Sequence, residues 1–227
     1  MNKSIAIIIQ ARINSKRCKN KMLRRFAGSS LFEIQVKKLN YLAKNYDQNV
    51  FCAIGELPLK KILKKYKFIN LIERNETSIS SDAIEDVFNY LKDVKEEYIC
   101  FVNACAPLLK LSTLKKAIML FTKSKIRSLT SVVEKKTWYF DDKGKPINDN
   151  SSGNTKDLSS IFECTHNFHI FNKRFFLKNK KYWSNKKNDP YLYPVNFIES
   201  LDIDTEEEFN AVQKIYKSLE TSNLSKI

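Results

Sequence analysis

The stretch that decides the fold is Ser4-Ile-Ala-Ile-Ile-Ile-Gln10, a short apolar run near the start of the chain. A continuous apolar run of this length is typical of a strand that is buried on both faces, as in a parallel sheet. A basic loop from Arg12 to Lys21 follows, and Ser30 with Glu33 forms a capping box that predicts the start of a helix. The chain therefore opens on a strand, a loop and a helix.

Outward from this unit, strands and helices are expected to alternate. The patterns predict strands at 49–54, 68–72, 98–102 and 128–133, and helices at 31–42, 58–66, 81–91 and 112–121. Such alternation predicts an α/β fold with a mostly parallel sheet between two layers of helices. Since ligands bind at the carboxyl ends of the strands in such sheets, the loops after Gln10 and after Val102 are the first places to look for a site.

The pattern changes after Val133. Residues 135–162 contain the turn signal Asp141-Asp-Lys-Gly144 and are expected to form a small excursion of strands and loops. We expect strands at 161–171 and 194–198 and a final helix at 206–219, capped by Thr205. We interpret residues 1–227 as a single domain that includes the excursion.

The formal net charge of +15 over 227 residues favours anionic ligands such as nucleotides or pyrophosphate. A general abundance of lysine explains part of this charge. The basic residues form no single stripe and no RNA-binding motif with interleaved aromatics is found, so nucleic acid is not the expected partner.

The five cysteines include no C-x-x-C pair, so neither a zinc site nor a disulfide framework is expected. Cys52 and Cys100 lie in apolar runs and are interpreted as small core residues. No apolar run reaches the ~18 residues of a membrane span. Without a signal-peptide pattern, the cytoplasm is the expected compartment.

The loop Gln10-Ala-Arg-Ile-Asn-Ser-Lys-Arg-Cys-Lys-Asn-Lys21 is rich in cations and hydroxyl groups. Backbone N–H groups ahead of a helix, with Arg and Lys side chains beside them, make a good polyphosphate site. The loop is neither a Walker loop nor a dinucleotide fingerprint, because the required glycines are missing. A solvated basic loop is the alternative interpretation.

Asp202 and Asp204 flank Ile203 just before the final helix. In an extended segment both carboxylates point to one side, and two such hard ligands suit Mg²⁺. Alternatively, the acidic residues from Asp204 to Glu208 serve the positive end of the helix.

Asn103 stands at the end of an expected strand, where its amide could contact the edge of a base. A cap at the strand end is the alternative. Cys105 is disfavoured as a nucleophile because no histidine lies near it in sequence.

Four segments together resemble known motifs. They are Gln10-Ala-Arg12 with Ser15-Lys-Arg17, Lys21 and Gly28; Arg74 with Ser81-Asp82; Asn103 to Leu108; and Leu201-Asp-Ile-Asp-Thr-Glu-Glu-Glu-Phe209. In this order they resemble the motifs of the acylneuraminate cytidylyltransferase family, which contains the CMP-sialic acid and CMP-Kdo synthetases. The resemblance extends over nearly the whole chain.

The resemblance implies a Rossmann-like nucleotidyltransferase fold, that of the nucleotide-diphospho-sugar transferases. It implies transfer of CMP from Mg-CTP to a small anionic acceptor, with release of pyrophosphate, in the synthesis of surface polysaccharide (capsule or LOS) precursors. It also implies a homodimer to which residues 135–162 contribute.

The same resemblance implies roles for individual residues. Arg12 and Lys21 would hold the phosphates and stabilise the transition state, and Asp202 and Asp204 would ligate Mg²⁺. The other nucleotide-binding residues would be Gln10, Ala11, Ser15, Lys16, Arg74, Ser81 and Asn103, the last of them on the cytosine.

The chain also departs from the family pattern. Ile13-Asn14 replaces Gly-Gly, Lys19 replaces Pro, Asn103 replaces Gln, Leu109 stands where sialate enzymes often carry Arg, and Thr165-His-Asn-Phe-His169 replaces an Asn-Gly acceptor motif. The last two departures leave the acceptor open between a nonulosonate acid sugar and a phosphorylated metabolite. His166 and Asn167 are the candidate acceptor contacts; alternatively, they are polar residues of a half-exposed strand.

Two other functions stay open. The Ile13-Asn14 departure allows a nucleotide-binding protein that has lost the reaction, and the net charge allows a basic nucleic-acid-binding protein on the same fold.

Overall fold

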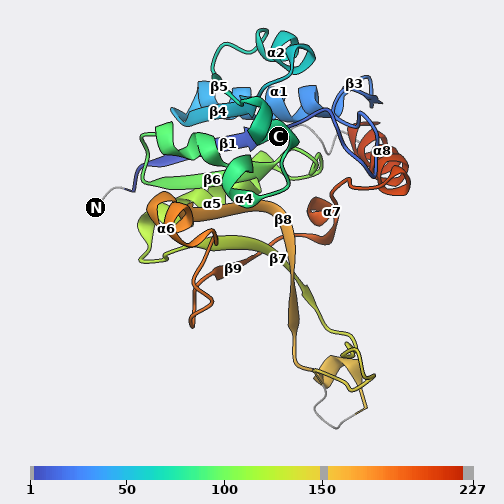
Figure 1. Cartoon of the computed structure of the whole chain (residues 1–227). Coiled ribbons are helices and arrows are strands. Elements are labelled where there is room, and N and C mark those ends of the chain that lie inside the picture. Colours follow the sequence, from blue (N-terminus) through green and yellow to red (C-terminus); the bar gives the residue numbers. More distant parts are fainter. Residues whose placement is uncertain (1–2, 149–152, 222–227) are drawn as a thin grey trace.

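A seven-stranded sheet with the order β5-β4-β1-β6-β8-β7-β9 forms the centre of the chain (Figure 1). The computed structural model describes residues 3–148 and 153–221. The strands of this sheet are β1 (Ile5–Gln10), β4 (Asn49–Ile54), β5 (Asn70–Glu73), β6 (Tyr98–Asn103), β7 (Leu129–Lys135), β8 (Ile161–Asn172) and β9 (Tyr191–Pro194). A separate short pair consists of β2 (Arg25–Phe26) and β3 (Ser29–Ser30).

The helices connect the strands and cover both faces of the sheet. They are α1 (Leu31–Tyr46), α2 (Leu57–Leu63), α3 (Glu76–Ser80), α4 (Ile84–Val87), α5 (Leu111–Lys123), α6 (Lys173–Asn179), α7 (Phe197–Ser200) and α8 (Glu206–Thr221), with 3₁₀ turns η1 (Asn89–Asp93) and η2 (Thr155–Asp157). None of the described helices combines the length and apolar character that a membrane span requires. The predicted three-layer α/β fold is confirmed.

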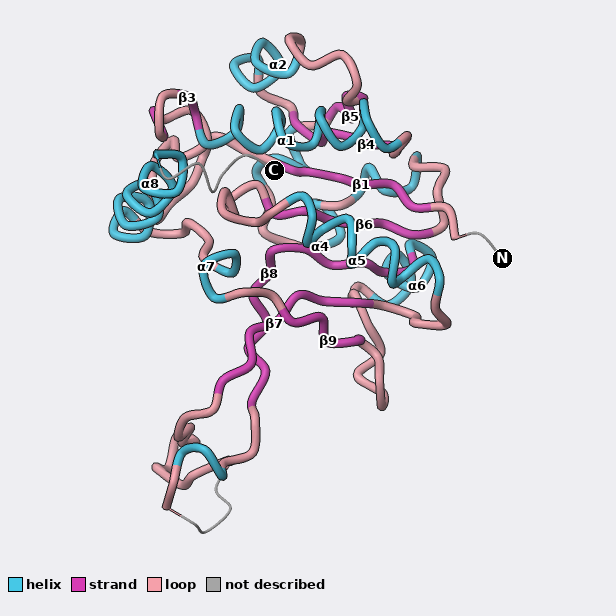
Figure 2. Tube along the Cα trace, turned by 180° about the vertical axis from the view of Figure 1, so that it is seen from behind, coloured by secondary structure: helices cyan, strands magenta, loops and turns pink. Residues whose placement is uncertain are grey.

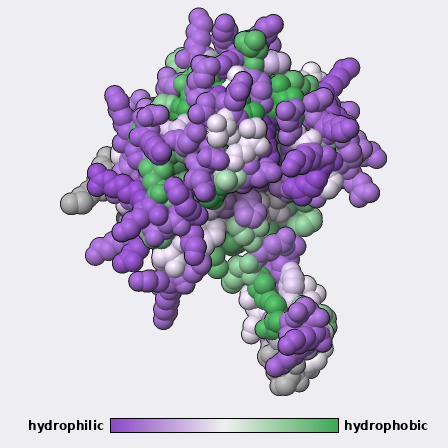
Figure 3. Space-filling model, in the orientation of Figure 1, coloured by the Kyte–Doolittle hydropathy of each residue, from purple (hydrophilic) through white to green (hydrophobic). Residues whose placement is uncertain are grey.

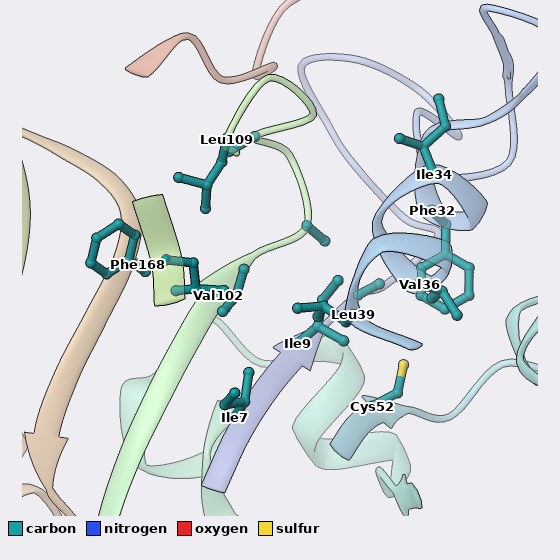
Figure 4. Packing of buried hydrophobic residues seen from close by; sticks show 14 of the residues in the cluster. Ile7, Ile9, Phe32, Ile34, Val36, Leu39, Cys52, Val102, Leu109 and Phe168 are labelled. Atoms are coloured by element: carbon teal, nitrogen blue, oxygen red, sulfur yellow. The ribbon is translucent and has the colours of Figure 1, made fainter. Parts of the chain in front are cut away.

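Alternating side chains of β1 enter two separate cores. Ile7 and Ile9 pack with α1 and α5 on one face, as Figure 4 shows for Ile9 beside Leu39. Ala6 and Ile8 pack on the opposite face with η1 and α6. Because both faces are covered, the strand needs apolar residues at every position, which explains its continuous apolar run.

The capping predictions at both ends of the chain are confirmed. The side chain of Ser30 accepts a hydrogen bond from the Glu33 N–H at the start of α1. Thr205 does the same for the N–H of Glu208 at the start of α8, at 3.2 Å. Cys52 and Cys100 are fully buried, as expected of core residues.

The second half of the sheet is less regular than the alternating pattern suggests. β8 pairs antiparallel with both β6 and β7, so it separates two strands that run in the same direction. The edge strand β9 is parallel to β7. The sheet is therefore mixed near this edge, although its β5-β4-β1-β6 half is fully parallel.

Two sequence-based assignments are wrong. The helix expected at 81–91 is divided among α4 and η1, and Ser81 instead ends α3, which Asn75 begins by capping the N–H of Ser78. The strand expected at 194–198 is displaced toward the N-terminus as β9, because the Asn196 side chain accepts from the N–H of Ile198 and starts α7.

The expected excursion is an arm that β7 and β8 carry away from the sheet (Figure 2). Asn148 organises its described part: its amide donates to the carbonyls of Thr137 and Ser159, and its oxygen accepts from the N–H of Tyr139. Figure 3 shows apolar residues where the arm leaves the body. Residues 149–152 of the predicted excursion lie outside the described residues, and its role in a dimer stays a prediction.

Candidate active site

A cavity of about 520 Å³ lies at the carboxyl end of β1. It is lined by Gln10, Ala11, Arg12, Ser15, Lys16, Arg17, Lys21, Met22, Arg74, Ser81, Asp82, Val87, Cys105 and Asp204. The lining comes from the end of β1 and the loop after it, from the segment between β5 and the end of α4, from the loop after β6 and from the segment before α8, which are far apart in sequence. This is where parallel α/β sheets bind their ligands.

The cavity brings together most of the predicted nucleotide-binding residues. Gln10, Ala11, Arg12, Ser15, Lys16, Lys21, Arg74 and Ser81 all line it, together with Asp204 from the predicted metal pair. Asn103, Asp202, His166 and Asn167 are not part of its lining. Arg17 and Asp82 belong to the quoted motifs, but the sequence analysis gave them no role in the site. Their place in the site becomes visible only through their ion pairs at the cavity, Asp82 with Arg12 and Arg17 with Asp204.

Arg12 and Lys16 are tied to the segment after α3. One nitrogen of the Arg12 guanidinium donates to the carbonyls of Ile79 and Ser81, both at 3.3 Å, and the other lies 3.1 Å from the Asp82 carboxylate. Lys16 pairs with the second oxygen of Asp82 at 3.2 Å. The hydrogen bonds from Arg12 and then Lys16 lower the pKa of Asp82. Two cations of the first loop are thus held at the cavity by protein oxygens.

Lys21 is the most enclosed cation of the first loop, with 8% of its surface exposed. Its ammonium donates to the carbonyl of Ile203 and lies 3.1 Å from the Asp204 carboxylate. Burial alone would lower the pKa of Lys21, but the hydrogen bonds and charges of its neighbours, the Asp204 carboxylate among them, outweigh burial and raise it. Lys21 therefore carries its positive charge inside the cavity at neutral pH.

Cys105 does not have the properties of a nucleophile. Burial raises the pKa of its thiol to about 11, so the reactive thiolate is scarce at neutral pH. This environment agrees with the sequence analysis, which disfavoured Cys105 as a nucleophile.

The segment that carries Asp202 and Asp204 is fixed by its central residue. Ile203 is fully buried, and its N–H donates to the carbonyl of Cys105 at 3.0 Å. Asp204 then meets Lys21, and its other oxygen lies 2.8 Å from the Arg17 guanidinium. Anchoring Ile203 thus places this acidic segment beside the loop after β6 and the basic loop after β1.

The two carboxylates have opposite environments. Burial, followed by the charges of Asp204 and Glu208, raises the pKa of Asp202. Burial would also raise the pKa of Asp204, but the hydrogen bond and charge of Lys21, with Arg17, outweigh it and lower the pKa. A half-buried carboxylate beside two like charges is stabilised by a cation, so this donor set fits Mg²⁺.

The alternative interpretation of the acidic segment, in which its carboxylates serve the start of the final helix, applies to Glu208. Its carboxylate accepts from the N–H groups of Asp204 and Thr205, both at 2.8 Å, and so completes the cap of α8. The helix start therefore uses Glu208 and leaves the Asp204 carboxylate to pair with Lys21 and Arg17.

Arg74 is buried, with 3% of its surface exposed, and its guanidinium is occupied by the protein itself. It donates to the carbonyl of Ala11 at 3.2 Å, to the Ser78 hydroxyl at 2.9 Å and to the Ser78 carbonyl. These bonds connect the start of the first loop to α3. The predicted contact of Arg74 with a nucleotide is untested, whereas its support of the loop is direct.

Asn103 forms the cap at a strand end that the sequence analysis gave as the alternative to a contact with a base. Its side-chain oxygen accepts from the N–H of Cys105 at 2.8 Å and so caps the end of β6. Contact with a base stays a prediction.

The two candidate acceptor residues occupy different environments. Asn167 is fully buried and its amide donates to the carbonyl of Glu199 at 2.7 Å, which joins β8 to α7. This burial argues against the predicted acceptor contact of Asn167. His166 is exposed, and its pKa is raised first by the Cys164 side chain and further by the charges of Asp202 and Asp204.

The comparison with protein families is decisive. The family model described as Cytidylyltransferase matches residues 6–227. The chain belongs to the cytidylyltransferase family. No curated protein matches it.

Several solved cytidylyltransferase structures share the fold. A 4-diphosphocytidyl-2C-methyl-D-erythritol synthase from Anaerococcus prevotii is 16% identical with a TM-score of 0.67, and the match covers 95% of this chain and 97% of that one. A CMP:2-keto-3-deoxy-manno-octonic acid synthetase complexed with CTP is 10% identical with a TM-score of 0.67, covering 95% and 99%. A cytidylyltransferase from Leptospira borgpetersenii is 15% identical with a TM-score of 0.60, covering 97% and 95%. The predicted nucleotide-diphospho-sugar transferase fold is confirmed.

Proposed function

We propose that this cytidylyltransferase transfers CMP from Mg-CTP to a small anionic acceptor and releases pyrophosphate. The observation that carries the proposal is the cavity at the carboxyl end of β1, which Arg12, Lys16, Arg17, Lys21 and Arg74 line with cations. Among the residues that the structure describes, the acidic groups that line the cavity opposite these cations are Asp82 and Asp204. The cavity volume of about 520 Å³ falls within the range of about 300–1,000 Å³ that is usual for small-molecule sites.

In the proposed reaction an acceptor oxygen attacks the α-phosphorus of CTP. A new P–O bond forms, the bond to the β-phosphate oxygen breaks, and pyrophosphate leaves with the electron pair. Such a reaction needs little covalent help from the protein, so positioning and charge stabilisation supply most of the acceleration.

Lys21 and Arg12 are the residues we assign to charge stabilisation. Lys21 is enclosed and fixed by Ile203 and Asp204, so little reorganisation is needed when negative charge develops on the phosphates. Arg12 and Lys16 each form a surface ion pair with Asp82. Triphosphate oxygens can replace the Asp82 carboxylate in both ion pairs.

Asp202 and Asp204 would hold Mg²⁺, which when bound offsets charge on the phosphate oxygens. The raised pKa of Asp202 and the proximity of Asp204 support this assignment.

For the acceptor, we propose a nonulosonate-type acid sugar or a small phosphorylated metabolite that serves as a surface polysaccharide precursor. The resemblance to the acylneuraminate group favours the first, and the departures at Leu109 and 165–169 keep the second open. The product distinguishes them, because an acid sugar becomes CMP-linked whereas a phosphate becomes CDP-linked.

Pyrophosphate release tests the proposal directly. The purified chain is incubated with Mg²⁺ and with CTP, UTP or ATP, each against acid sugars and sugar or polyol phosphates. We expect release with CTP and one class of acceptor, and mass spectrometry of the product identifies that class. Equal inactivity with all three nucleotides would refute the proposal, and retention on RNA at physiological salt would then favour the nucleic-acid alternative.

The Asp202→Asn variant tests the metal site. We expect its activity to need at least about tenfold more Mg²⁺ for half-maximal rate, because it loses one of two charged ligands. Glu207→Gln is the matched control, since Glu207 is an exposed acid of the neighbouring helix turn. The same Mg²⁺ midpoint in both variants would contradict a metal role for Asp202.

A further inference from the structure

Both histidines of the chain meet one cysteine at the base of the arm. His166 and His169 are the two histidines in the sequence, and they lie on β8 with Cys164. The ligand atoms of the three side chains all lie within 4.8 Å of one another. Apart from the candidate acceptor contact of His166, the proposed transfer reaction gives this cluster no role.

A bulge in β8 creates the cluster. Thr130 of β7 is paired with His169 and Val132 with Cys164, so a step of two residues on β7 spans five residues on β8. In a regular strand, Cys164 and His166 would share one face and His169 would lie on the other. The bulge removes this alternation, and the left-handed backbone of His166, with φ of 54°, belongs to it.

Two distances within the cluster are close to those of a tetrahedral metal site. The Nδ1 atom of His166 lies 3.2 Å from Nε2 of His169 and 3.9 Å from Sγ of Cys164. With Zn–N near 2.05 Å and Zn–S near 2.3 Å, tetrahedral zinc places two nitrogens about 3.3 Å apart and a nitrogen and a sulfur about 3.6 Å apart. These two distances are within a few tenths of an ångström of the tetrahedral values, and the ligand atoms of all three side chains lie within 4.8 Å of one another.

Thr130 supports the orientation that metal binding requires. Its hydroxyl lies 2.8 Å from Nδ1 of His169 and 3.3 Å from Sγ of Cys164. When Nδ1–H donates to this hydroxyl, the lone pair of Nε2 points into the cluster, and the hydroxyl proton is free to donate to sulfur. The His169 ring is further fixed by stacking on Tyr182, with centroids 4.9 Å apart.

We propose that Cys164, His166 and His169 bind a zinc ion through Sγ, Nδ1 and Nε2. One thiolate and two imidazoles suit zinc and not Mg²⁺, which takes oxygen ligands. Three protein ligands leave a fourth position for water or a small ligand. The sequence analysis expected no zinc site because the chain has no C-x-x-C pair. The proposed site needs only one cysteine, and the bulge in β8 brings that cysteine to the two histidines.

Cobalt substitution provides a direct test that does not depend on CTP or on activity. The chain, without any affinity tag, is titrated with Co²⁺ under reducing conditions. We expect saturation at one equivalent, with a thiolate-to-cobalt charge-transfer band and the visible bands of tetrahedral Co²⁺, and displacement by Zn²⁺. An absence of these bands in the folded wild type would overturn the proposal.

Variants assign the ligands. Cys164→Ser should lose the charge-transfer band and His169→Ala the tetrahedral spectrum, whereas Cys52→Ala, which removes a thiol far from the cluster in the core, should keep both. A charge-transfer band that persists in Cys164→Ser would overturn the assignment.

Thr130→Val provides a second test that retains all three ligands. We expect its zinc affinity, measured by competition with a chromophoric chelator, to fall about 10- to 100-fold, the usual effect of removing a partner of the ligands. An unchanged affinity would overturn the role of Thr130 in the site, and circular dichroism verifies the fold of each variant.

Discussion

Replacing Lys21 with alanine is expected to lower kcat for cytidylyl transfer by about 100- to 1,000-fold, the usual effect of removing a fixed charge-stabilising donor. The Lys21 ammonium is enclosed, charged, and held by Ile203 and Asp204 at the cavity. An enclosed cation stabilises developing negative charge more strongly than a solvated one. Steady-state pyrophosphate release with CTP and the identified acceptor measures the effect.

The control is Lys37→Ala, which removes an exposed lysine from α1. Its kcat should equal that of the wild type. Because Lys21→Ala also leaves Asp204 with one fewer partner, thermal unfolding of the variant is measured alongside. A well-folded Lys21→Ala variant with a rate within about threefold of wild type would show that the role assigned to Lys21 is wrong.

Replacing Arg74 with methionine is expected to lower the free energy of unfolding by about 2–4 kcal/mol, because hydrogen bonds from a buried charged group are lost together and their acceptors stay buried. The acceptors are the Ala11 carbonyl and the hydroxyl and carbonyl of Ser78. Urea unfolding followed by circular dichroism measures the loss. Since Ala11 begins the loop of the cavity, we also expect weaker CTP binding.

Arg25→Met is the matched control, because Arg25 is exposed on β2 and its side chain makes no such set of hydrogen bonds with the described part of the chain. It should unfold at nearly the wild-type urea concentration. If Arg74→Met is equally stable but loses CTP affinity, Arg74 contacts the nucleotide directly, as the family resemblance implies. If it loses stability as expected, Arg74 supports the loop from within the protein.

The regular half of the fold was predictable because its signals are local. The apolar run of β1, the cap of α1 at Ser30 and the cap of α8 at Thr205 each depend on residues within a few positions of one another. The predictions were wrong where a nearby asparagine caps a short helix. Asn75 starts α3 and Asn196 starts α7, and the hydrophobic spacing did not indicate either helix.

The candidate site was predictable in part for a different reason. The family resemblance gave an ordered set of motifs, and Arg12, Lys21 and Asp204 do meet at one cavity. It could not show that Arg74 is occupied by backbone oxygens or that Asn167 is buried, because burial depends on which elements pack around a side chain.

The sequence by itself determined the strand–loop–helix at Gln10, the α/β class and the cytidylyltransferase motifs, because apolar periodicity, caps and motif order are all properties of neighbouring residues. Only the tertiary structure decided that β8 lies between β6 and β7, and that its bulge turns Cys164, His166 and His169 toward one point. The physical reason is that strand order and register result from pairing between distant segments, and a shift in register changes which side chains share a face.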